Sequence, residues 1–356
     1  MIVNSGDEMA LYLIRAGVNG ELENHFLDNN RVYLRWGGLF DGQDIATFGD
    51  YEGIKNAALA ELPNENTKKL INGAGQINTF VFRIKIGDWI VLPLKRKAAI
   101  AIGKVTSDYQ FDSSVESDFR HYRTIQWLNK DVPRSLFDQD MLYSFGAFMT
   151  VCQIQRNDAE NRIKQLAANN WKRTGSVASE VNTQITIESE DSQPVDLATL
   201  AQDQIAALII RKFAGNSMER LVEGILKAQG FKTWRNPGGT DKSIDILAAQ
   251  GHLGFEPPKI CVQVKSQDTP VDRPTLDQLR GGMKRAGATQ GLLVSWGGFK
   301  STVEQEIPLQ FFDVRLWDQQ ELIEQLLAVY DKLDEQLRTE IPLKRVWMVA
   351  APEEEM

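Results

Sequence analysis

Asp245, Gln263 and Lys265 are the most informative residues of the chain, because together they could carry out a chemical reaction. Asp245 lies in an apolar run that covers residues 243–249. Gln263 and Lys265 lie in a second run, which covers residues 260–265. Both runs have the length and composition of short buried β-strands bounded by Gly and Pro. We therefore expect an acid, an amide and a lysine to meet at the ends of two neighbouring strands.

The Gln-x-Lys spacing places both polar groups on one face of a strand, because side chains alternate between the two faces. Cys261 precedes them in phase, whereas Val262 and Val264 point to the opposite face. An aspartate on the adjacent strand can then hold a divalent cation beside a lysine that orients a water molecule or helps to deprotonate it. Hydrolysis of a phosphodiester needs these functions. The pattern predicts Mg²⁺-dependent cleavage of nucleic acid.

The residues by themselves leave a structural alternative open. Gln-x-Lys is a short pattern that chance supplies often, and Asp245 and Lys265 could form an ion pair at a sheet edge. The surrounding sequence raises the specificity of the signal. Gly238-Gly239-Thr240-Asp241 precedes the first strand, and a helix that carries Glu219 precedes this segment.

Glu219 has more than one possible role. Its helix has apolar residues at amphipathic spacing, so Glu219 could face solvent or pair with Arg220 or Lys227. It could also face the predicted metal site. Glu223, one turn later, is the alternative acid.

Several motifs occur in order along this half of the chain: Met218-Glu219-Arg220-Leu221-Val222, Gly230-Phe231, Asn236-Pro237-Gly238-Gly239-Thr240-Asp241-Lys242-Ser243-Ile244-Asp245, Val262-Gln263-Val264-Lys265, and Gly291-Leu292-Leu293-Val294-Ser295 followed by Gly297-Gly298-Phe299. With them, residues 213–327 resemble the catalytic domain of the Mrr-like restriction endonucleases, within the PD-(D/E)xK nucleases. The resemblance implies a restriction-endonuclease-like α/β domain.

The resemblance also implies roles for individual residues. Asp245 is then the main metal ligand, Gln263 replaces the commoner acidic ligand, and Lys265 is the catalytic lysine. Glu219 is the helix acid near the metal. The implied cofactor is Mg²⁺, with Mn²⁺ as a substitute. The amide of Gln263 removes one negative charge, which would lower the affinity for the metal.

Length and charge limit the class of protein. The chain has 356 residues, 42% of them hydrophobic, which is enough for two cores. Its net charge of −8 would be unexpected for a protein that holds DNA by overall charge alone. Local basic groups would then bind DNA, although each could instead be a solvated surface. The candidates are Lys95-Arg96-Lys97, Arg120 with Arg123, Lys172-Arg173, and Arg280 with Lys284 and Arg285.

The cysteines and the apolar segments indicate an intracellular protein. Cys152 and Cys261 are far apart in apolar strands, so we expect reduced core residues and neither a disulfide nor a zinc site. The histidines form no ligand pair. No segment has the length of a bilayer span, and the N-terminus lacks a signal pattern. We expect a cytoplasmic location and no membrane partner.

The chain is expected to be a mixed α+β protein of several parts. Residues 1–154 are rich in strands and predict a compact β-barrel with a few helices. Residues 155–210 predict a helical and flexible linker, and residues 174–194 are its polar portion. Residues 211–340 form the nuclease domain, and residues 341–356 form a tail. The strands expected in the first part cover residues 11–15, 32–36, 80–84, 89–94, 98–105, 124–128 and 148–154, and its helices cover residues 50–62 and 67–73.

The first part carries a second resemblance. Its motifs are Ile86-Gly87-Asp88-Trp89-Ile90-Val91-Leu92-Pro93, Ile102-Gly103-Lys104-Val105-Thr106-Ser107-Asp108-Tyr109 and His121-Tyr122-Arg123-Thr124-Ile125-Gln126-Trp127-Leu128. With them, residues 1–154 resemble the EVE-type branch of PUA-like barrels. Such barrels are similar to modules that extrude a nucleotide and hold its base between aromatic faces, where stacking is worth about 1–3 kcal/mol per base.

The aromatic candidates for a modified-base pocket are Trp36, Tyr109, Phe111, Tyr122 and Trp127, with Arg15, Arg35 and Asp41 as partners of the base edge or a phosphate. The alternative is that most of the aromatic residues belong to the core, Trp127 above all. Tyr109 and Phe111 are the better candidates, since they lie in a loop beside Asp108 and Asp112.

The two halves together predict a modification-dependent, type IV-like restriction endonuclease that acts on foreign double-stranded DNA carrying modified bases. Cleavage of both strands favours a homodimer or a larger homo-oligomer, with predicted helices at residues 275–285 and 318–337 as a contact face. Two alternatives remain: a structure-dependent DNA nuclease that does not sense modification, and a non-catalytic reader of modified nucleic acid.

Overall fold

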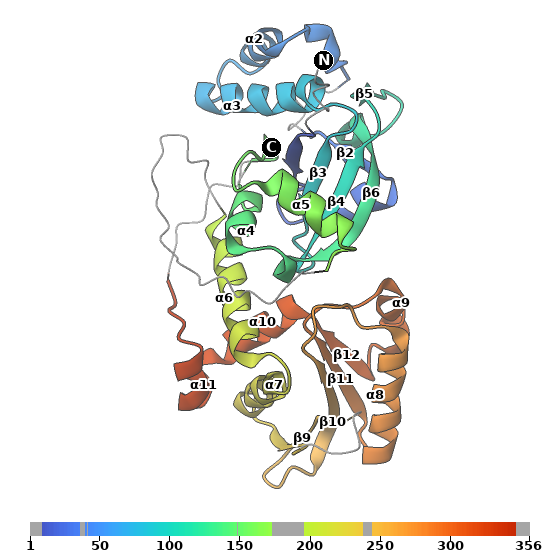
Figure 1. The fold of residues 1–356 in the computed structure, drawn as a ribbon, viewed down its shortest axis with the longest axis vertical. Helices are drawn as coiled ribbons and strands as arrows, with labels where there is room; N and C mark the ends of the chain where they lie inside the picture. Colours follow the sequence, from blue (N-terminus) through green and yellow to red (C-terminus); the bar gives the residue numbers. More distant parts are fainter. Residues whose placement is uncertain are drawn as a thin grey trace, which may run out of the picture. The chain divides into compact units, whose positions relative to one another are not determined.

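The computed structural model describes most of the chain, namely residues 9–35, 40, 42–147, 149–172, 196–237 and 244–346. The chain divides into two compact units, with the division between Leu200 and Ala201. The fold is mixed α+β, because each unit contains a sheet with helices packed on it (Figure 1). The polar segment at residues 174–194 lies outside the described residues. Among the described residues, no helix is both long and apolar enough to cross a bilayer.

The first unit is built on a curled sheet. Its strands are β1 (Leu11–Ile14), β2 (Arg31–Tyr33), β3 (Trp89–Pro93), β4 (Ala99–Val105), β5 (Gln110–Phe111), β6 (His121–Pro133) and β7 (Val151–Gln153). Their order is β2-β6-β4-β3-β1-β7, and β5 pairs with β6. β1 runs parallel to β3, and the other paired strands are antiparallel. Among the described residues, β2 and β7 at the two ends of this order are not paired with each other, so a closed barrel stays a prediction.

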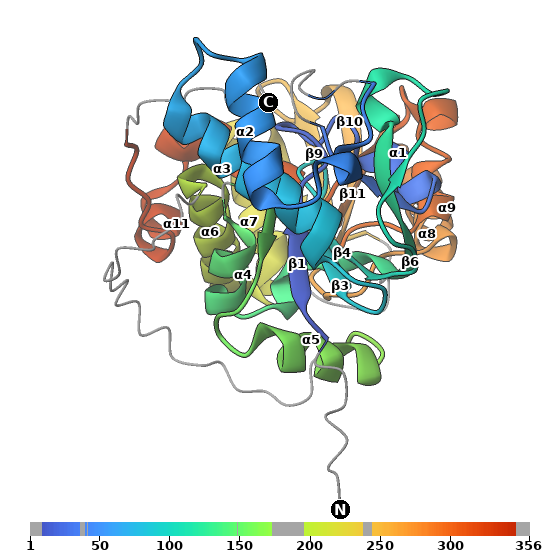
Figure 2. The ribbon, with the colours of Figure 1, turned by 90° about the horizontal axis from the view of Figure 1, so that it is seen from above.

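Helices cover both faces of this sheet. They are α1 (Glu23–Asp28), η1 (Ile45–Phe48), α2 (Tyr51–Glu61), α3 (Thr67–Asn78), η2 (Thr79–Arg83), η3 (Ser117–Phe119), η4 (Arg134–Leu136), α4 (Gln139–Phe145) and α5 (Ala159–Ala168). Helices α2 and α3 lie side by side in both ribbon views (Figures 1 and 2). Local sequence fixes where they begin, since Asp50 accepts a hydrogen bond from Gly53 N and Asn66 accepts one from Lys68 N.

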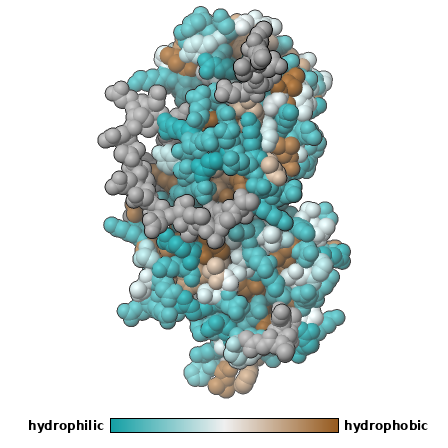
Figure 3. Space-filling view, in the orientation of Figure 1, coloured by the Kyte–Doolittle hydropathy of each residue, from teal (hydrophilic) through white to brown (hydrophobic). Residues whose placement is uncertain are grey.

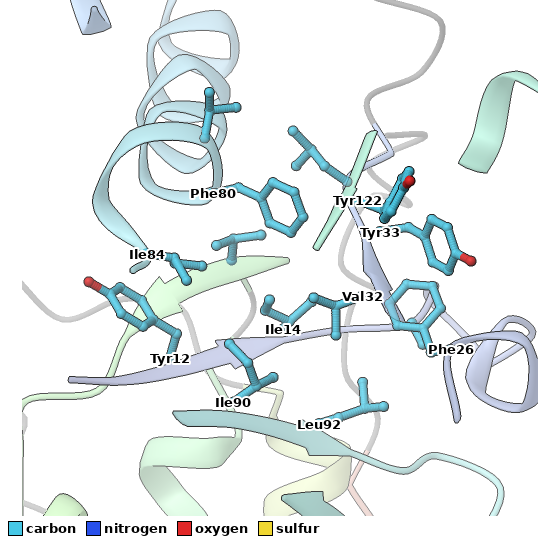
Figure 4. Packing of buried hydrophobic residues seen from close by; sticks show 14 of the residues in the cluster. Tyr12, Ile14, Phe26, Val32, Tyr33, Phe80, Ile84, Ile90, Leu92 and Tyr122 are labelled. Atoms are coloured by element: carbon cyan, nitrogen blue, oxygen red, sulfur yellow. The ribbon is translucent and has the colours of Figure 1, made fainter. Parts of the chain in front are cut away.

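β1 shows why the central strands are apolar throughout. Tyr12 and Ile14 pack into one core, which includes residues of α2, α3 and η2 (Figure 4). Leu11 and Leu13 point to the opposite face and pack into a second core with residues of α4 and α5. Successive side chains of a strand alternate between faces, so a strand covered on both sides is hydrophobic at every position.

The strand predicted at residues 80–84 is wrong. This segment is the π-helical η2, which continues directly from α3. Phe80 and Val81 are buried, whereas Phe82 and Arg83 are exposed, so the side chains follow a helical surface. β-branched and aromatic residues favour a strand locally, but packing of this segment into the core overrides the preference. The remaining strands and helices predicted in this part are present with shifted ends.

The second unit contains a five-stranded sheet in its described residues. Its strands are β8 (Lys232–Arg235), β9 (Ile246–Gln250), β10 (Glu256–Lys265), β11 (Gln290–Ser295) and β12 (Val314–Trp317). The order is β12-β11-β10-β9-β8. β10, β11 and β12 are parallel, whereas β9 is antiparallel to both β10 and β8.

The helices of the second unit lie on both faces of this sheet (Figure 1). They are α6 (Leu197–Phe213), which begins before the division, α7 (Ser217–Ala228), α8 (Arg273–Ala286), α9 (Ser301–Glu304), η5 (Pro308–Gln310), α10 (Gln319–Val329), η6 (Tyr330–Lys332) and α11 (Glu335–Glu340). Val262 and Val264 pack into the core that includes residues of α7 and α10. Cys261 packs into the core on the α8 face, which confirms the predicted alternation along β10. Both Cys152 and Cys261 are buried, as expected.

The prediction of one continuous helix at residues 318–337 is wrong. α10 ends at Val329, a short 3₁₀ turn follows, and α11 begins at Glu335. Asp334 caps the new helix by accepting a hydrogen bond from Leu337 N over 2.8 Å. The periodic apolar pattern continues through the break, and so the sequence did not reveal it.

Candidate active site

Asp245 lies immediately before β9, where this strand meets β10. Its backbone N–H donates to Val262 O over 3.0 Å. Its carboxylate oxygen Oδ2 accepts a 2.6 Å hydrogen bond from Val264 N. These two contacts hold the carboxylate against the end of the strand that carries Gln263 and Lys265.

Gln263 and Lys265 lie at the end of β10, in the interior of the sheet. Gln263 pairs in register with Leu293, and Lys265 with Ser295. The side chain of Gln263 is completely buried, at 0% exposure, whereas that of Lys265 is half-buried. Burying an amide costs free energy unless its polar atoms have partners. A completely buried glutamine in a central strand is therefore unusual.

Glu219 is in the first turn of α7 and lies within electrostatic range of the strand residues. Burial raises the pKa of its carboxyl, and the charge of Asp245 raises it further. Lys265 and Arg235 act in the opposite direction. The structure therefore brings Glu219, Asp245 and Lys265 into one electrostatic group.

The cations that the sequence offered as partners for Glu219 are bound to other acids. Arg220 donates hydrogen bonds from both terminal nitrogens to the Glu340 carboxylate. Lys227 pairs with Glu223 over 2.9 Å. Neither ion pair therefore removes Glu219 from the group around Asp245.

Glu223 has a different environment from Glu219. Its carboxylate accepts hydrogen bonds from Thr233 Oγ1 over 2.9 Å and from Arg235 Nε over 3.2 Å. Burial alone raises the pKa of this carboxyl, but bonds from Lys227 and Thr233 outweigh burial and hold it below its usual value. Glu223 thus joins α7 to β8, and Glu219 is the acid that interacts with Asp245.

The charge of Asp245 is only partly balanced by the protein. Burial raises the pKa of its carboxyl, while the Val264 N–H and the charge of Lys265 lower it. A bound cation would stabilise the ionised form. In the described part of the chain, no group of three or more His, Cys, Asp or Glu side chains gathers in a way that could hold a metal. Two carboxylates and the Gln263 amide are oxygen donors, which fit Mg²⁺ with several of its waters retained.

In the first unit, Tyr109 and Phe111 lie together around His121. Tyr109 Oη is 2.8 Å from His121 Nδ1 and accepts a bond from Ile45 N over 3.2 Å. The rings of Tyr109 and His121 stack with centroids 6.0 Å apart, and those of Phe111 and His121 with centroids 5.1 Å apart. Burial raises the pKa of Tyr109 well above its usual value, so its hydroxyl stays protonated.

Tyr122 and Trp127 take part in packing. Tyr122 is buried beside Tyr33, as Figure 4 shows, and the Arg31 guanidinium lies 4.0 Å from its ring centroid. Trp127 packs partly buried against the same core and lies over Gly103, where an added Cβ would be 2.8 Å from Trp127 Cε3. Both aromatic side chains thus contribute to the packing around β6.

Arg15 and Arg35, two of the polar candidates for the pocket, contact residues other than Tyr109, Phe111 and His121. Arg15 donates to Ala147 O from Nε over 3.0 Å and from Nη2 over 2.6 Å. Arg35 pairs with Asp118 over 2.9 Å and with Glu21 over 3.6 Å. The other candidates, Trp36 and Asp41, lie outside the described residues.

A family model described as "Restriction endonuclease" (Mrr_cat) matches residues 210–326. This segment is a restriction endonuclease domain. It places the second unit among the DNA endonucleases, which are hydrolases. A second model, for a domain of unknown function (DUF8426), matches residues 12–154.

Solved structures similar to the chain include two restriction enzymes. One is "MspJI Restriction Endonuclease in Complex with 27-mer Oligonucleotide", with 14% identity, a TM-score of 0.31, and coverage of 92% of this chain and 71% of that one. The other is "DNA modification-dependent restriction endonuclease AspBHI", with 12% identity, a TM-score of 0.30, and coverage of 82% of this chain and 71% of that one. No curated protein matches the chain.

No role was predicted for Arg235, which lies near the predicted site of the restriction endonuclease domain. It is the last residue of β8, and its charge lowers the pKa of Glu219. A polar residue of an edge strand gave no local sign of this position. His121 was likewise missed, although its motif was noted, because pairing of β5 with β6 is what brings it to Phe111.

The proposed basic groups differ in their environments. Arg123 is wrong as a surface candidate, because it is buried at 1% exposure and donates to the carbonyl oxygens of Phe80, Val81 and Ser107. Burial lowers its pKa to about 10. In the restriction endonuclease domain, Arg280 is paired with Asp277 and Glu306. Hydrophilic residues predominate on the face shown in Figure 3.

Proposed function

We propose that this protein is a modification-dependent, type IV-like restriction endonuclease. The first unit binds a modified base, and the restriction endonuclease domain hydrolyses phosphodiester bonds of the same DNA. The observation that carries the catalytic half is the grouping of Glu219, Asp245 and Lys265 at the end of the strand in which Gln263 is buried. An acid pair beside a lysine suits metal-assisted attack of water on a phosphodiester.

Within this site, Asp245 and Gln263 would hold Mg²⁺, and Mn²⁺ would substitute for it. The metal, when bound, would neutralise charge on the phosphoryl oxygens. Val264 keeps the Asp245 carboxylate oriented through its backbone N–H. Lys265 would orient the attacking water and help to remove its proton. Glu219 would add a second carboxylate on the helix side of the site.

The first unit would act as an EVE-type, PUA-like base-binding domain. Tyr109, Phe111 and His121 form a group of stacked rings on the curled sheet, and stacking on a base is worth about 1–3 kcal/mol. Trp36 and Asp41 remain pocket candidates by sequence. Tyr122 and Trp127 would support the pocket from the core, and Arg15 and Arg35 would contact DNA only after leaving their present partners.

The remaining parts of the proposal concern organisation and partners. Residues 1–154 would bind the base, residues 155–210 would link the units, residues 211–340 would cleave, and residues 341–356 would be a tail. The substrate would be double-stranded DNA, and a homodimer or larger assembly would cut both strands. The biological role would be the cytoplasmic restriction of foreign DNA.

The test uses purified protein with Mg²⁺ and linear DNAs that differ only in cytosine: unmodified, methylated, hydroxymethylated or glucosylated. Cleavage of one modified DNA, lost in Asp245→Ala and Lys265→Ala, would support both halves of the proposal. Asp277→Ala, which changes an exposed aspartate of the same domain, should leave cleavage intact. Equal cleavage of every DNA would favour a structure-dependent nuclease. Absence of cleavage with every DNA would favour a non-catalytic reader.

A further inference from the structure

Glu223 and Glu219 lie one turn apart on α7 and therefore share one side of the helix. Glu219 interacts with Asp245, whereas Glu223 binds the neighbouring strand. Thr233 and Arg235 are two residues apart on β8, so both point to the same face and reach the Glu223 carboxylate together. The Glu223 side chain is only 12% exposed. Arg235 is thus anchored at a fixed place relative to α7.

The end of β8 adjoins the start of β9 at the predicted metal site. Arg235 pairs in register with Ile246, the residue after Asp245. The next residue, Asn236, donates its backbone N–H to Asp245 O over 2.8 Å and its side-chain amide to Ile244 O over 3.1 Å. Arg235 therefore lies on the neighbouring strand, one residue along from the position opposite Asp245.

The guanidinium of Arg235 keeps most of its hydrogen-bonding capacity. Its contact with Glu223 is made through Nε, and its side chain is 39% exposed. Among the described residues, Nη1 and Nη2 make no further ion pair or side-chain hydrogen bond. By comparison, Arg220 uses both terminal nitrogens on Glu340, and Arg280 uses both on acidic residues. Two donors of a planar fork suit a phosphate group.

We infer that Arg235 binds a phosphate of the DNA backbone next to the scissile bond, and that Glu223 and Thr233 are the residues that position its guanidinium. The inference rests on the proposed function, because it takes Asp245 as the centre of cleavage. It deepens that proposal by naming how the strand is held. A phosphate group that approaches two carboxylates needs cations beside it. Lys265 on β10 is one such cation. Arg235 on β8, on the other side of β9, adds a second.

Lys227 provides a matched control. It binds the same Glu223 carboxylate over 2.9 Å, but it lies one turn further along α7, and its side chain is 55% exposed. Lys227 is two turns from Glu219 on the helix, whereas the charge of Arg235 lowers the pKa of Glu219. Lys227→Ala and Arg235→Ala therefore both remove one cation from Glu223, and only the second change removes a cation from the predicted site.

The experiment measures binding of the full-length chain to labelled duplexes with unmodified or modified cytosine, in EDTA, over a series of salt concentrations. Arg235→Ala should reduce the slope of log K against log salt by about one, as expected for loss of one phosphate contact. Lys227→Ala should retain the wild-type slope. An unchanged slope in Arg235→Ala would overturn the inference, even if this variant unfolds at a lower temperature, because the arginine would then serve only as the partner of Glu223.

Cleavage with Mg²⁺ separates this inference from the proposed function. Arg235→Ala should lower kcat/KM about 10–100-fold relative to Lys227→Ala, and Arg235→Lys should restore the salt slope but little of the rate, since an ammonium lacks the fork. Glu223→Gln should lower the rate less than Arg235→Ala, because Thr233 and the amide still support the arginine. A reduced slope together with wild-type protein that cuts no DNA would support the phosphate contact and count against the nuclease proposal. If the wild-type protein cleaves DNA and the Arg235→Ala and Lys227→Ala variants cleave it at equal rates, the inference about Arg235 would be wrong and the proposed function would stand.

Discussion

Val264 donates its backbone N–H to Asp245 Oδ2 over 2.6 Å, which fixes this carboxylate against β10. Burial raises the pKa of the same carboxyl, and the Val264 N–H and Lys265 only oppose that effect. The side chain is therefore oriented by the fold while its charge remains poorly balanced. This combination suits a ligand of a divalent cation.

Replacing Asp245 with Asn should abolish most cleavage. The substitution keeps the shape and the acceptor for Val264 N, so the fold should be preserved. Loss of a direct ligand should cost more than the ~10–100-fold effect of losing a supporting residue. The measurement is the rate of Mg²⁺-dependent DNA cleavage, with Asp277→Asn as the control. A near-wild-type rate in Asp245→Asn would contradict the assignment.

Gln263→Glu should strengthen metal binding and weaken the metal-free protein. The new carboxylate would be completely buried where the wild-type side chain is neutral, so its ionisation in the absence of metal would cost free energy. We expect a lower Tm than wild type in EDTA and a larger rise on addition of Mg²⁺ or Mn²⁺. Thermal unfolding with and without metal tests this. Equal metal-induced shifts in the two proteins would show that residue 263 does not contact the ion.

Glu219 and Glu223 should respond to pH in opposite ways. The folded state raises the pKa of Glu219, so its contribution to stability is present at low pH and lost as the pH rises through the folded-state pKa. The folded state lowers the pKa of Glu223, so its contribution is present above the unfolded-state pKa and lost as the pH falls. In EDTA at neutral pH, Glu219→Gln should therefore raise Tm and Glu223→Gln should lower it. The reverse order would mean that the two acids have exchanged roles.

Phe111→Ala should impair recognition of the modified base without changing the chemistry of cleavage. Loss of one stacking surface should weaken binding of modified DNA by about 1–3 kcal/mol. Binding of unmodified DNA should change little. Phe312→Ala, which removes an exposed ring of the other unit, is the control. Competition binding with matched duplexes gives the answer, and equal losses for both duplexes would exclude Phe111 from base recognition.

Gly103→Ala should destabilise the first unit by about 1–3 kcal/mol. An added Cβ would lie 2.3 Å from Ile125 Cγ2 and 2.8 Å from Trp127 Cε3. Gly75→Ala in α3 is the control, since nothing lies within 4 Å of its Cβ position. That change should stabilise the protein by about 0.5–1 kcal/mol, because alanine favours a helix. Urea unfolding measures both, and a tolerated Gly103→Ala would show that Ile125 and Trp127 can move.

Features that depend on local periodicity could be predicted before the structure was known. Alternation along residues 260–265 placed Cys261 on one face and Val262 and Val264 on the other, as the two cores confirm. The apolar context of Cys152 and Cys261 was enough to expect that both are buried. These predictions succeed because neighbouring residues of a strand share its geometry wherever the strand lies.

Contacts between groups that are distant in the chain could not be predicted in this way. Because α7 packs on the sheet, Glu219 interacts electrostatically with Asp245, and Glu223 forms an ion pair with Arg235. The helix pattern left open which of the two acids would lie near Asp245. Packing also made residues 80–84 helical and buried Arg123 among backbone carbonyls. Such outcomes depend on contacts between residues far apart in the chain, whose free energies exceed local preferences and leave no periodic trace in the sequence.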